Sequence, residues 1–499
     1  MGASRHIMKK PQEKQRNVLW PQMLAAGLAT TCAMCSGTVL GWTSPTLPVM
    51  EEPHLVVTHN YNSTNVTRTS MVSEAQASWI GSLVPLGALV GALPAGFIAD
   101  GLGRKPLILF LGILFLLGWV LIILSHEVVV YIYAGRFIQG IAAGAITVAI
   151  PLYNEEITEP SIRGKVGVFF DLMINVGILW SYSLGVIIPY PNLSIASGCL
   201  PLLFFITFVW MPESPVHLVT KGRILQAESA LKWLRSGGSS DWDIQPELTK
   251  LQTLVSQSKA ERETQKKLSL KERFSELSWS SPKSKPIKII FGLMILRPLS
   301  GINSITFYTV KIFQEAGSGL SPNVATIIIG CILVTSNYVS SKLVDRIGRR
   351  ILFLCSGAGV TLCYVIMITY FELKDHDIDV SHVSWLPLVA IGIFVVSFCL
   401  GIGPLPWLLM AELLPIEHKK WASGMGVCIT WSLSFLVTKF FGKMINELGG
   451  TVTYGTFCIF CALGTMYIAL FVPETKGKTR EELQKEMGMR TEMNTIAVA

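Results

Sequence analysis

Two charged side chains stand inside long apolar segments of this sequence, Asp171 in one and Arg297 in another. A carboxylate accepts hydrogen bonds and a guanidinium donates them, so these side chains suit either one another or a polar solute. Each of them alone near the centre of a bilayer would cost on the order of 2.5–3.5 kcal/mol. We therefore expect them to form an ion pair in a solute path. A pair that only neutralises itself leaves the solute uncharged, whereas an arginine fork also suits an anion, and both alternatives stay open.

Helical spacing gives both charged residues polar neighbours. Asp171 shares a helix face with Asn175, four residues later. Arg297 begins a stripe of small or polar residues at spacings of 4, 3, 4 and 3, namely Gly301, Ser304, Tyr308 and Lys311. Residues three and four apart lie on one face of a helix, so we expect both stripes to face a central cavity.

The sequence shows no pattern typical of covalent catalysis. It has no nucleophile–base–acid set, no phosphate-binding loop and no metal-ligand cluster such as HExxH. His217 and His418 are single histidines in polar segments, and the ten cysteines lie in or beside apolar runs. We therefore predict a protein that is not an enzyme and that has no cofactor, metal site or disulfide framework.

The elements that must position these residues are membrane helices. Hydrophobic residues make up 51% of the chain and charged residues only 15%, against about 25% charged in soluble domains. About twelve apolar runs recur along the chain, each of about 20 residues, the length that crosses a bilayer as a helix. The sequence thus predicts an all-α membrane protein.

The distribution of basic residues predicts the orientation. Lys and Arg gather in the N-terminal segment and in every second loop, and cytosolic loops carry such an excess. An even number of helices then places both termini in the cytosol, and topology explains the net charge of +8 without nucleic acid. The first exterior loop, 43–76, carries sequons at Asn62 and Asn65. We therefore expect glycosylation there and a multi-pass protein of the plasma membrane.

The two halves of the chain repeat one another. Three motif pairs occur in the same order: GFIADGLGRKP (96–106) with KLVDRIGRR (342–350), PLYNEEITEPSIRGK (151–165) with PWLLMAELLPIEHKK (406–420), and PESPVHLVTKGR (212–223) with PETKGKTREEL (473–483). Such a repeat predicts two parallel bundles with a solute site between them near mid-membrane. The predicted units are a tail at 1–19, a six-helix bundle at 20–215, a linker at 216–286, a second bundle at 287–472 and a tail at 473–499.

Acid and base alternate at the cytosolic ends of both bundles. We expect four pairs that separate when this side opens: Asp100 with Arg104, Glu156 with Arg163, Asp345 with Arg349, and Glu412 with Lys419. The alternative is that the basic residues only set the topology and have incidental counterions. In the linker, residues 222–236 have the spacing of an amphipathic helix. We expect it to pack on the bundle, with a calmodulin-type or lipid-surface role as the alternative.

These motifs, in this order, resemble the sugar porter family of the major facilitator superfamily over nearly the whole chain. The D-x-x-G-R turns, PESP, GIN (301–303), GIGPLPW (401–407) and PETKGKT all match, and FYTVKIFQEAG (307–317) is most similar to insect facilitated trehalose transporters. The resemblance implies twelve helices in two pseudo-symmetric six-helix bundles, alternating access, and sugars that move without chemical change. We expect the protein to act as a monomer in membrane lipid.

The resemblance carries over unevenly to the residues that would touch sugar. It implies binding roles for Asn303, Tyr308, Gly403 and Trp407, whose ring either packs on the C–H face of a pyranose or fills a helix interface. Positions that usually hold glutamine or asparagine here read Asp171, Arg297, Pro298, Leu333, Thr430 and Ser434. Glycines and prolines at 401–406, and Pro298 with Gly301, predict broken helices beside this site.

The predicted function is facilitated diffusion of trehalose or a hexose. We assign Asp171, Asn175, Arg297 and Thr430 to the binding residues along with those that the family implies. The sequence favours facilitated diffusion over proton coupling, because Gly41-Trp42-Thr43 lacks the acid that proton-coupled sugar porters carry in the first helix, while Asp171 keeps proton coupling open as an alternative. Two alternatives remain: a nutrient receptor that does not transport, and a carrier of a charged or polyol-like solute.

Overall fold

The computed structural model describes residues 18–60, 63–125, 128–236, 244–266, 284–317, 320–414, 416–478 and 482–483. Within these residues, eleven helical segments are long and apolar enough to cross a membrane. The last of them, Trp421–Phe471, is broken at Gly449, whose φ of 81° separates two helices. The described helices therefore accommodate the twelve predicted spans, and the chain is a multi-pass membrane protein.

The N-terminal half forms one helical bundle. Its helices are α1 (Trp20–Glu51), α2 (Glu74–Leu102), α3 (Arg104–Ile123), α4 (Val129–Ile157), α5 (Pro160–Ile187) and α6 (Tyr190–Phe208). Glycines bring these helices together: a Cβ on Gly144 of α4 would lie 2.0 Å from the Ala88 oxygen of α2. A Cβ on Gly177 of α5 would likewise lie 2.2 Å from the Met34 oxygen of α1. Membrane helices whose backbones approach this closely need small residues at the contact.

The C-terminal half forms a second bundle with two broken helices. Its helices are α11 (Lys285–Leu299), α12 (Ile302–Ala316), α13 (Pro322–Ile347), α14 (Arg349–Asp375), α15 (Leu386–Leu400), α16 (Leu405–Leu413) and α17 (Ile416–Phe471). The break between α11 and α12 lies at Gly301, whose φ is 81°, and the break between α15 and α16 covers Gly401–Pro404. Tyr364 donates a hydrogen bond of 2.5 Å to the freed carbonyl of Ser300. Both breaks predicted from proline and glycine are confirmed.

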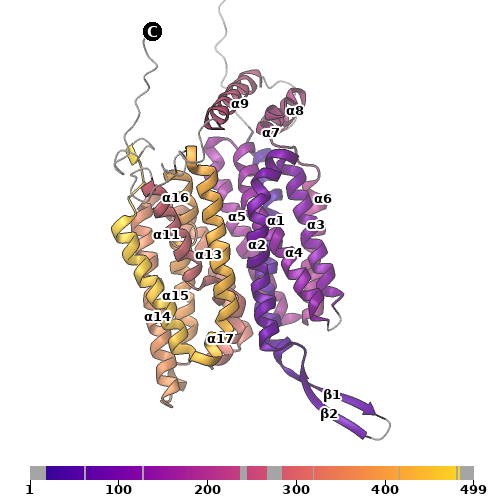
Figure 1. Ribbon diagram of the computed structural model, residues 1–499, viewed down its shortest axis with the longest axis vertical. Coiled ribbons are helices and arrows are strands. Elements are labelled where there is room, and N and C mark those ends of the chain that lie inside the picture. The colour runs from indigo at the N-terminus through magenta and orange to yellow at the C-terminus, as the bar shows by residue number, and fades with distance from the viewer. Residues whose placement is uncertain are drawn as a thin grey trace, which may run out of the picture.

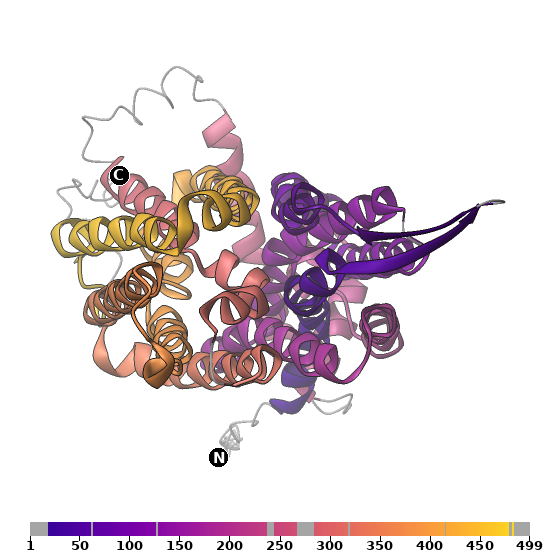
Figure 2. The same ribbon diagram turned by 90° about the horizontal axis from the view of Figure 1, so that it is seen from below.

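The two bundles lie side by side and have different structures at their opposite ends (Figure 1). One end, here called the linker end, carries α7 (Pro215–Thr220), α8 (Ile224–Ser236) and α9 (Gln245–Lys266). The other, called the hairpin end, carries strands β1 (Pro53–Asn60) and β2 (Ser63–Ser70), which pair antiparallel. Seen along the bundles, the two halves of the chain occupy separate sides of the molecule (Figure 2). The two side-by-side bundles that the repeat predicts are confirmed.

The loop expected at 43–76 contains more regular structure than the sequence suggested. Helix α1 continues to Glu51, and the β1–β2 hairpin follows within the same loop. Asn65 lies in β2 at the register position of Thr58, whereas Asn62 falls outside the described residues. Glycosylation of these two sequons stays a prediction.

Candidate functional site

Arg297 lies where the two helix breaks of the C-terminal half meet. It belongs to the last turn of α11, and its Nε donates to the Gly403 carbonyl at 3.4 Å. Its guanidinium carbon lies 5.6 Å from the centre of the Trp407 ring, within reach of a cation–π interaction. The break between α15 and α16 supplies both partners, because it exposes the carbonyl and begins the short helix that carries Trp407. The structure thus brings together three of the predicted binding residues.

Asp171 lies in α5 of the N-terminal half. The side chains of Asp171 and Arg297 are both half-buried. Between these two described side chains, however, no N···O contact of 4.0 Å or less is present. Asn175, one turn further along α5, is also half-buried. The direct ion pair expected between Asp171 and Arg297 is therefore not formed in this structure, although the two residues come from opposite halves of the chain.

The other predicted binding residues differ in burial, with Asn303 half-buried and Tyr308 and Thr430 buried. Asn303 is half-buried and donates through Nδ2 to the Ser434 hydroxyl at 2.7 Å, which joins α12 to α17. Tyr308 is buried, sits at a kink in α12 and donates to the Thr438 carbonyl at 3.3 Å. Thr430 is also buried, and its hydroxyl lies 3.2 Å from the Met294 carbonyl inside the C-terminal bundle. The structure does not place Thr430 beside Arg297 among the accessible polar groups.

Contacts that join the two halves gather toward the hairpin end. Lys311 of α12 forms an ion pair of 3.4 Å with Glu51 of α1, and the Ser78 hydroxyl donates to the Lys439 carbonyl at 2.6 Å. The Lys439 ammonium lies 3.8 Å from the centre of the Trp79 ring. Further contacts between the halves join α5 to α12, where the Tyr182 hydroxyl donates to the Thr306 carbonyl at 2.6 Å, and α12 to α1, where the Val310 amide donates to the Ser44 hydroxyl at 3.2 Å. Sequence reasoning named only Lys311 among these residues, although the cationic Lys439 in an apolar helix was a signal that could have been followed.

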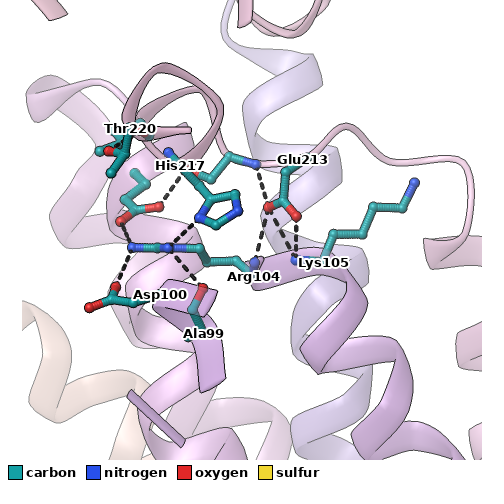
Figure 3. A network of polar contacts seen from close by, with 10 residues as sticks. Ala99, Asp100, Arg104, Lys105, Glu213, His217 and Thr220 are labelled. Atoms are coloured by element: carbon teal, nitrogen blue, oxygen red, sulfur yellow. Dashed lines mark hydrogen bonds and ion pairs between the residues drawn. The ribbon is translucent and has the colours of Figure 1, made fainter. Parts of the chain in front are cut away.

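At the linker end, Arg104 organises a compact cluster in the N-terminal half (Figure 3). One of its terminal nitrogens contacts Glu156 at 2.8 Å and Asp100 at 3.2 Å. The other donates to the Ala99 carbonyl at 2.9 Å and lies 2.8 Å from Nδ1 of His217. Because a guanidinium can only donate, this arrangement requires Nδ1 of His217 to be unprotonated. His217 is thus part of a cluster of polar side chains, which its isolated position in the sequence did not predict.

Glu213 holds the turn that aims Arg104 into this cluster. Its carboxylate accepts from the backbone amides of Arg104 and Lys105, each at 3.2 Å. Gly103 precedes them with a φ of 116°, and a Cβ there would lie 2.4 Å from the Glu213 carboxylate. The Ser214 hydroxyl donates to Glu156 and links the carboxylate of α4 to the same turn. The glycine is required both by its backbone angle and by this close approach.

The C-terminal half repeats the arrangement around Arg349. Its Nη2 lies 3.3 Å from Glu412, and its backbone amide donates to Glu474 at 3.0 Å. The Thr475 hydroxyl donates to Glu412 at 2.6 Å, as Ser214 does to Glu156. Gly348 has a φ of 112°, and a Cβ there would lie 2.8 Å from Glu474. Backbone amides at Arg349, Arg350, Thr475 and Lys476 lower the pKa of Glu474 despite its partial burial.

One of the expected pairs needs correction. Glu156 pairs with Arg104, whereas Arg163 lies on the surface at 3.9 Å from Glu155. Glu412 contacts Arg349, and the pairs of Asp345 with Arg349 and of Glu412 with Lys419 stay predictions, because the side chains of Asp345 and Lys419 lie outside the described part. The backbone geometry explains these partners. The positive-φ glycines Gly103 and Gly348 direct the side chains of Arg104 and Arg349 toward the interior of their own bundles, whereas Arg163 lies beyond the end of α4. Asp100 with Arg104 is the expected pair that the described side chains confirm.

Comparison with known proteins extends this picture over the whole chain. The family model "Sugar (and other) transporter" matches residues 28–487. The facilitated trehalose transporter Tret1-2 homolog of Drosophila simulans is 34% identical over 99% of this chain and 97% of its own length. Tret1 of Polypedilum vanderplanki is 33% identical over 96% of this chain and 90% of its own. Tret1 of Drosophila mojavensis is 35% identical over 96% of this chain, which spans about half (53%) of that longer relative.

Solved structures agree in fold at low sequence identity. The inward open conformation of the xylose transporter XylE from E. coli superposes with a TM-score of 0.72. It covers 94% of this chain and 100% of its own, at 20% identity. The proton:xylose symporter XylE bound to 6-bromo-6-deoxy-D-glucose gives a TM-score of 0.70 at 21% identity, with 94% of this chain and 99% of its own covered. The arrangement of helices in this chain is therefore the one found in those proteins.

Proposed function

The chain belongs to the Sugar (and other) transporter family, and from this premise we propose that it carries a sugar across a membrane by facilitated diffusion and alternating access. The observation that carries the proposal is the group around Arg297. Two helix breaks of one half bring the Arg297 guanidinium, the Gly403 carbonyl and the Trp407 ring together, and Asp171 of the other half supplies the opposite charge. A solute between these residues would touch both halves at once, as alternating access requires.

The proposed orientation places the linker end in the cytosol and the hairpin end outside the cell, at the plasma membrane. The basic N-terminal segment and the basic turns at Arg104 and Arg349 support it, because cytosolic loops carry such an excess. In this orientation the contacts from Lys311 to Glu51 and from Lys439 to Trp79 close the exterior side. The structure then represents the state in which the solute site is closed to the exterior.

The proposed solute is trehalose or a hexose. The relatives named as facilitated trehalose transporters support this choice, since they align along 96–99% of this chain. The Trp407 ring offers a flat apolar face for a sugar ring, and Arg297, Asn175 and Asn303 offer donors for its hydroxyl groups. The Asp171 carboxylate can accept a hydrogen bond from a sugar hydroxyl group.

The surroundings of a second arginine, Arg136, support uniport without proton coupling. Arg136 of α4 is fully buried and donates to the carbonyls of Val39 and Ile80 at 2.6 and 3.2 Å. Its guanidinium carbon also lies 5.3 Å from the centre of the Trp42 ring. The residue next to that tryptophan is Thr43, which has no carboxylate to exchange a proton. Action as a monomer and glycosylation at Asn62 and Asn65 complete the proposal.

Uptake into proteoliposomes tests this function. The purified chain should take up labelled trehalose or a hexose to equilibrium, with saturation, and at the same rate with or without a pH gradient. Accumulation above equilibrium that depends on the gradient would replace uniport by proton symport. Absence of flux for every sugar, polyol and organic anion in the panel, with binding retained, would favour a receptor.

A further inference from the structure

A groove at the linker end has lining residues that the transport cycle does not explain. Its volume is about 480 Å³, and it lies between the end of α6 and one face of α8. The lining comprises Trp210, Pro212, Glu213, Leu218, Leu225, Gln226, Ser229, Ala230 and Trp233. Leu225, Ser229 and Trp233 are spaced by four residues and form one stripe of α8.

The groove presents apolar side chains that nothing in the described chain covers. Trp210 is 80% exposed and Leu225 is 81% exposed, although both line the groove. The opposite face of α8 is already used, because Ala227 and Leu231 pack with α7 and α9 in a small core. Exposed apolar surface of this kind marks a binding site when it is continuous and hollow.

The position of the groove relative to the membrane helices indicates which kind of ligand can reach it. The apolar span α6 ends at Phe208, and Trp210 follows two residues later. Trp20, at the start of the span α1, lies edge-on to Trp233 with ring centres 6.5 Å apart. Tryptophans gather at the boundary between acyl chains and headgroups, so these three rings place the groove at that level of the bilayer.

The charged residues near the groove indicate the charge of the ligand that it would bind. Lys221 and Arg223 are exposed in the turn that leads into α8, directly before Leu225. The one acidic residue of the lining, Glu213, is already engaged, since its carboxylate accepts from the backbone amides of Arg104, Lys105 and Ser214. A ligand in the groove therefore meets mainly apolar walls, and two exposed basic residues stand in the turn that leads into α8.

We propose that this groove binds an anionic phospholipid from the leaflet on the linker side. The upper part of an acyl chain and the glycerol region lie between Trp210 and the stripe Leu225–Ser229–Trp233. The phosphate and headgroup lie toward Lys221 and Arg223. The lipid bridges the transmembrane span α6 and the surface helix α8, and so couples the linker helices to the membrane.

The test uses the full-length chain in nanodiscs of phosphatidylcholine that contain phosphatidylserine with a photoreactive group in its acyl chain. After illumination, mass spectrometry should find the label on peptides that contain Trp210 and residues 225–233. Leu225→Gln should lower labelling of these peptides about tenfold, because it removes the burial of one leucine side chain. Leu254→Gln, at an exposed leucine of α9, is the matched control and should leave the labelling unchanged.

A second pair of variants tests the headgroup. The double variant Lys221→Gln with Arg223→Gln should bring labelling by phosphatidylserine down to that by photoreactive phosphatidylcholine, whereas Lys250→Gln on α9 should not. Equal labelling in the wild-type chain and in Leu225→Gln, with unfolding temperatures unchanged, would overturn the proposal. So would labelling of the groove that arises only after deletion of residues 2–17, because that segment of the chain would then be the occupant.

Discussion

The clusters around Arg104 and Arg349 occupy equivalent places in the two halves, and their differences show which parts of the repeat carry the structure. In both, a glutamate caps the turn after a positive-φ glycine, and a hydroxyl group and an arginine meet on a second glutamate. Two copies that have diverged elsewhere in sequence have kept this arrangement. The contacts that the two clusters share therefore hold the helices of each bundle together at the linker end.

The cluster of the N-terminal half is the tighter of the two. Arg104 and Glu156 are 8% and 10% exposed and 2.8 Å apart, whereas Arg349 and Glu412 are 14% and 26% exposed and 3.3 Å apart. Water screens a charge pair, so the drier pair interacts more strongly and suffers more when one partner is removed. The fourth residue after the capping glutamate also differs, being His217 in one half and Lys478 in the other.

Removal of each arginine should give the largest effect and the clearest difference between the halves. Arg104→Ala leaves Glu156 buried without its cation, and we expect a loss of about 3–5 kcal/mol in stability. Arg349→Ala leaves a more accessible Glu412, and we expect about 1–2 kcal/mol. Midpoints of thermal unfolding in detergent measure both. Equal losses in the two variants would contradict the difference inferred from burial.

Substitution of the turn glycines should rank second. Gly103→Ala and Gly348→Ala each force an L residue into positive φ and push a Cβ toward a carboxylate at 2.4 or 2.8 Å. We expect each to cost about 1–3 kcal/mol, with Gly103→Ala the worse of the two. Gly101→Ala in the same motif is the control, because a Cβ there meets nothing within 4 Å. If Gly101→Ala destabilised the protein as much as Gly103→Ala, the capped turn would not be the cause.

Acidification should weaken the N-terminal cluster and not the C-terminal one, because among the residues that the structure describes only the N-terminal cluster contains a histidine, His217. Burial and the charge of Arg104 lower the pKa of His217 from its ordinary 6.5, while Glu213 and Asp100 oppose this and Lys221 adds to it. The unfolded chain therefore binds the proton more readily, so stability is full above about pH 6.5 and falls as the pH drops toward the lowered pKa. His217→Gln should flatten the unfolding temperature between about pH 7.5 and about pH 5.5.

The control for this pH effect is a histidine at the opposite end. His376, at the end of α14, is 67% exposed, and His376→Gln should leave the pH dependence as it is in the wild type. An unchanged slope in His217→Gln would mean that other groups cause the dependence. Because the C-terminal cluster has Lys478 at the equivalent position, no comparable step is expected from it.

The smallest effect should come from the pair that sequence reasoning named and the structure rearranged. Arg163→Ala removes an exposed contact of 3.9 Å with Glu155. Exposed pairs contribute about 0–1 kcal/mol, so the unfolding midpoint should barely move. A loss as large as that of Arg104→Ala would restore the pairing of Arg163 with Glu156.

The sequence predicted features that depend on local chemistry. Span length, the bend at Gly301 and the break at 401–404 follow from apolar runs and from residues that cannot continue a helix. The repeat located both clusters, but spacing along the chain suggested the wrong partner for Glu156. The partners come from helices far apart in sequence, and only the packing of the bundle decides them. The contact of His217 with Arg104 and that of Lys439 with Trp79 were missed for the same reason.

The central claim is that each half moves as a body, with its linker-end cluster intact, while contacts between the halves open and close. Electron paramagnetic resonance distances between spin labels test it most directly. One pair of labels, at residues 165 and 346, spans the halves at the linker end; the other, at residues 75 and 446, spans them at the hairpin end. Addition of the transported sugar should produce a population with a shorter linker-end distance and a longer hairpin-end distance. Two distances that stay fixed, or that lengthen together, would contradict the account.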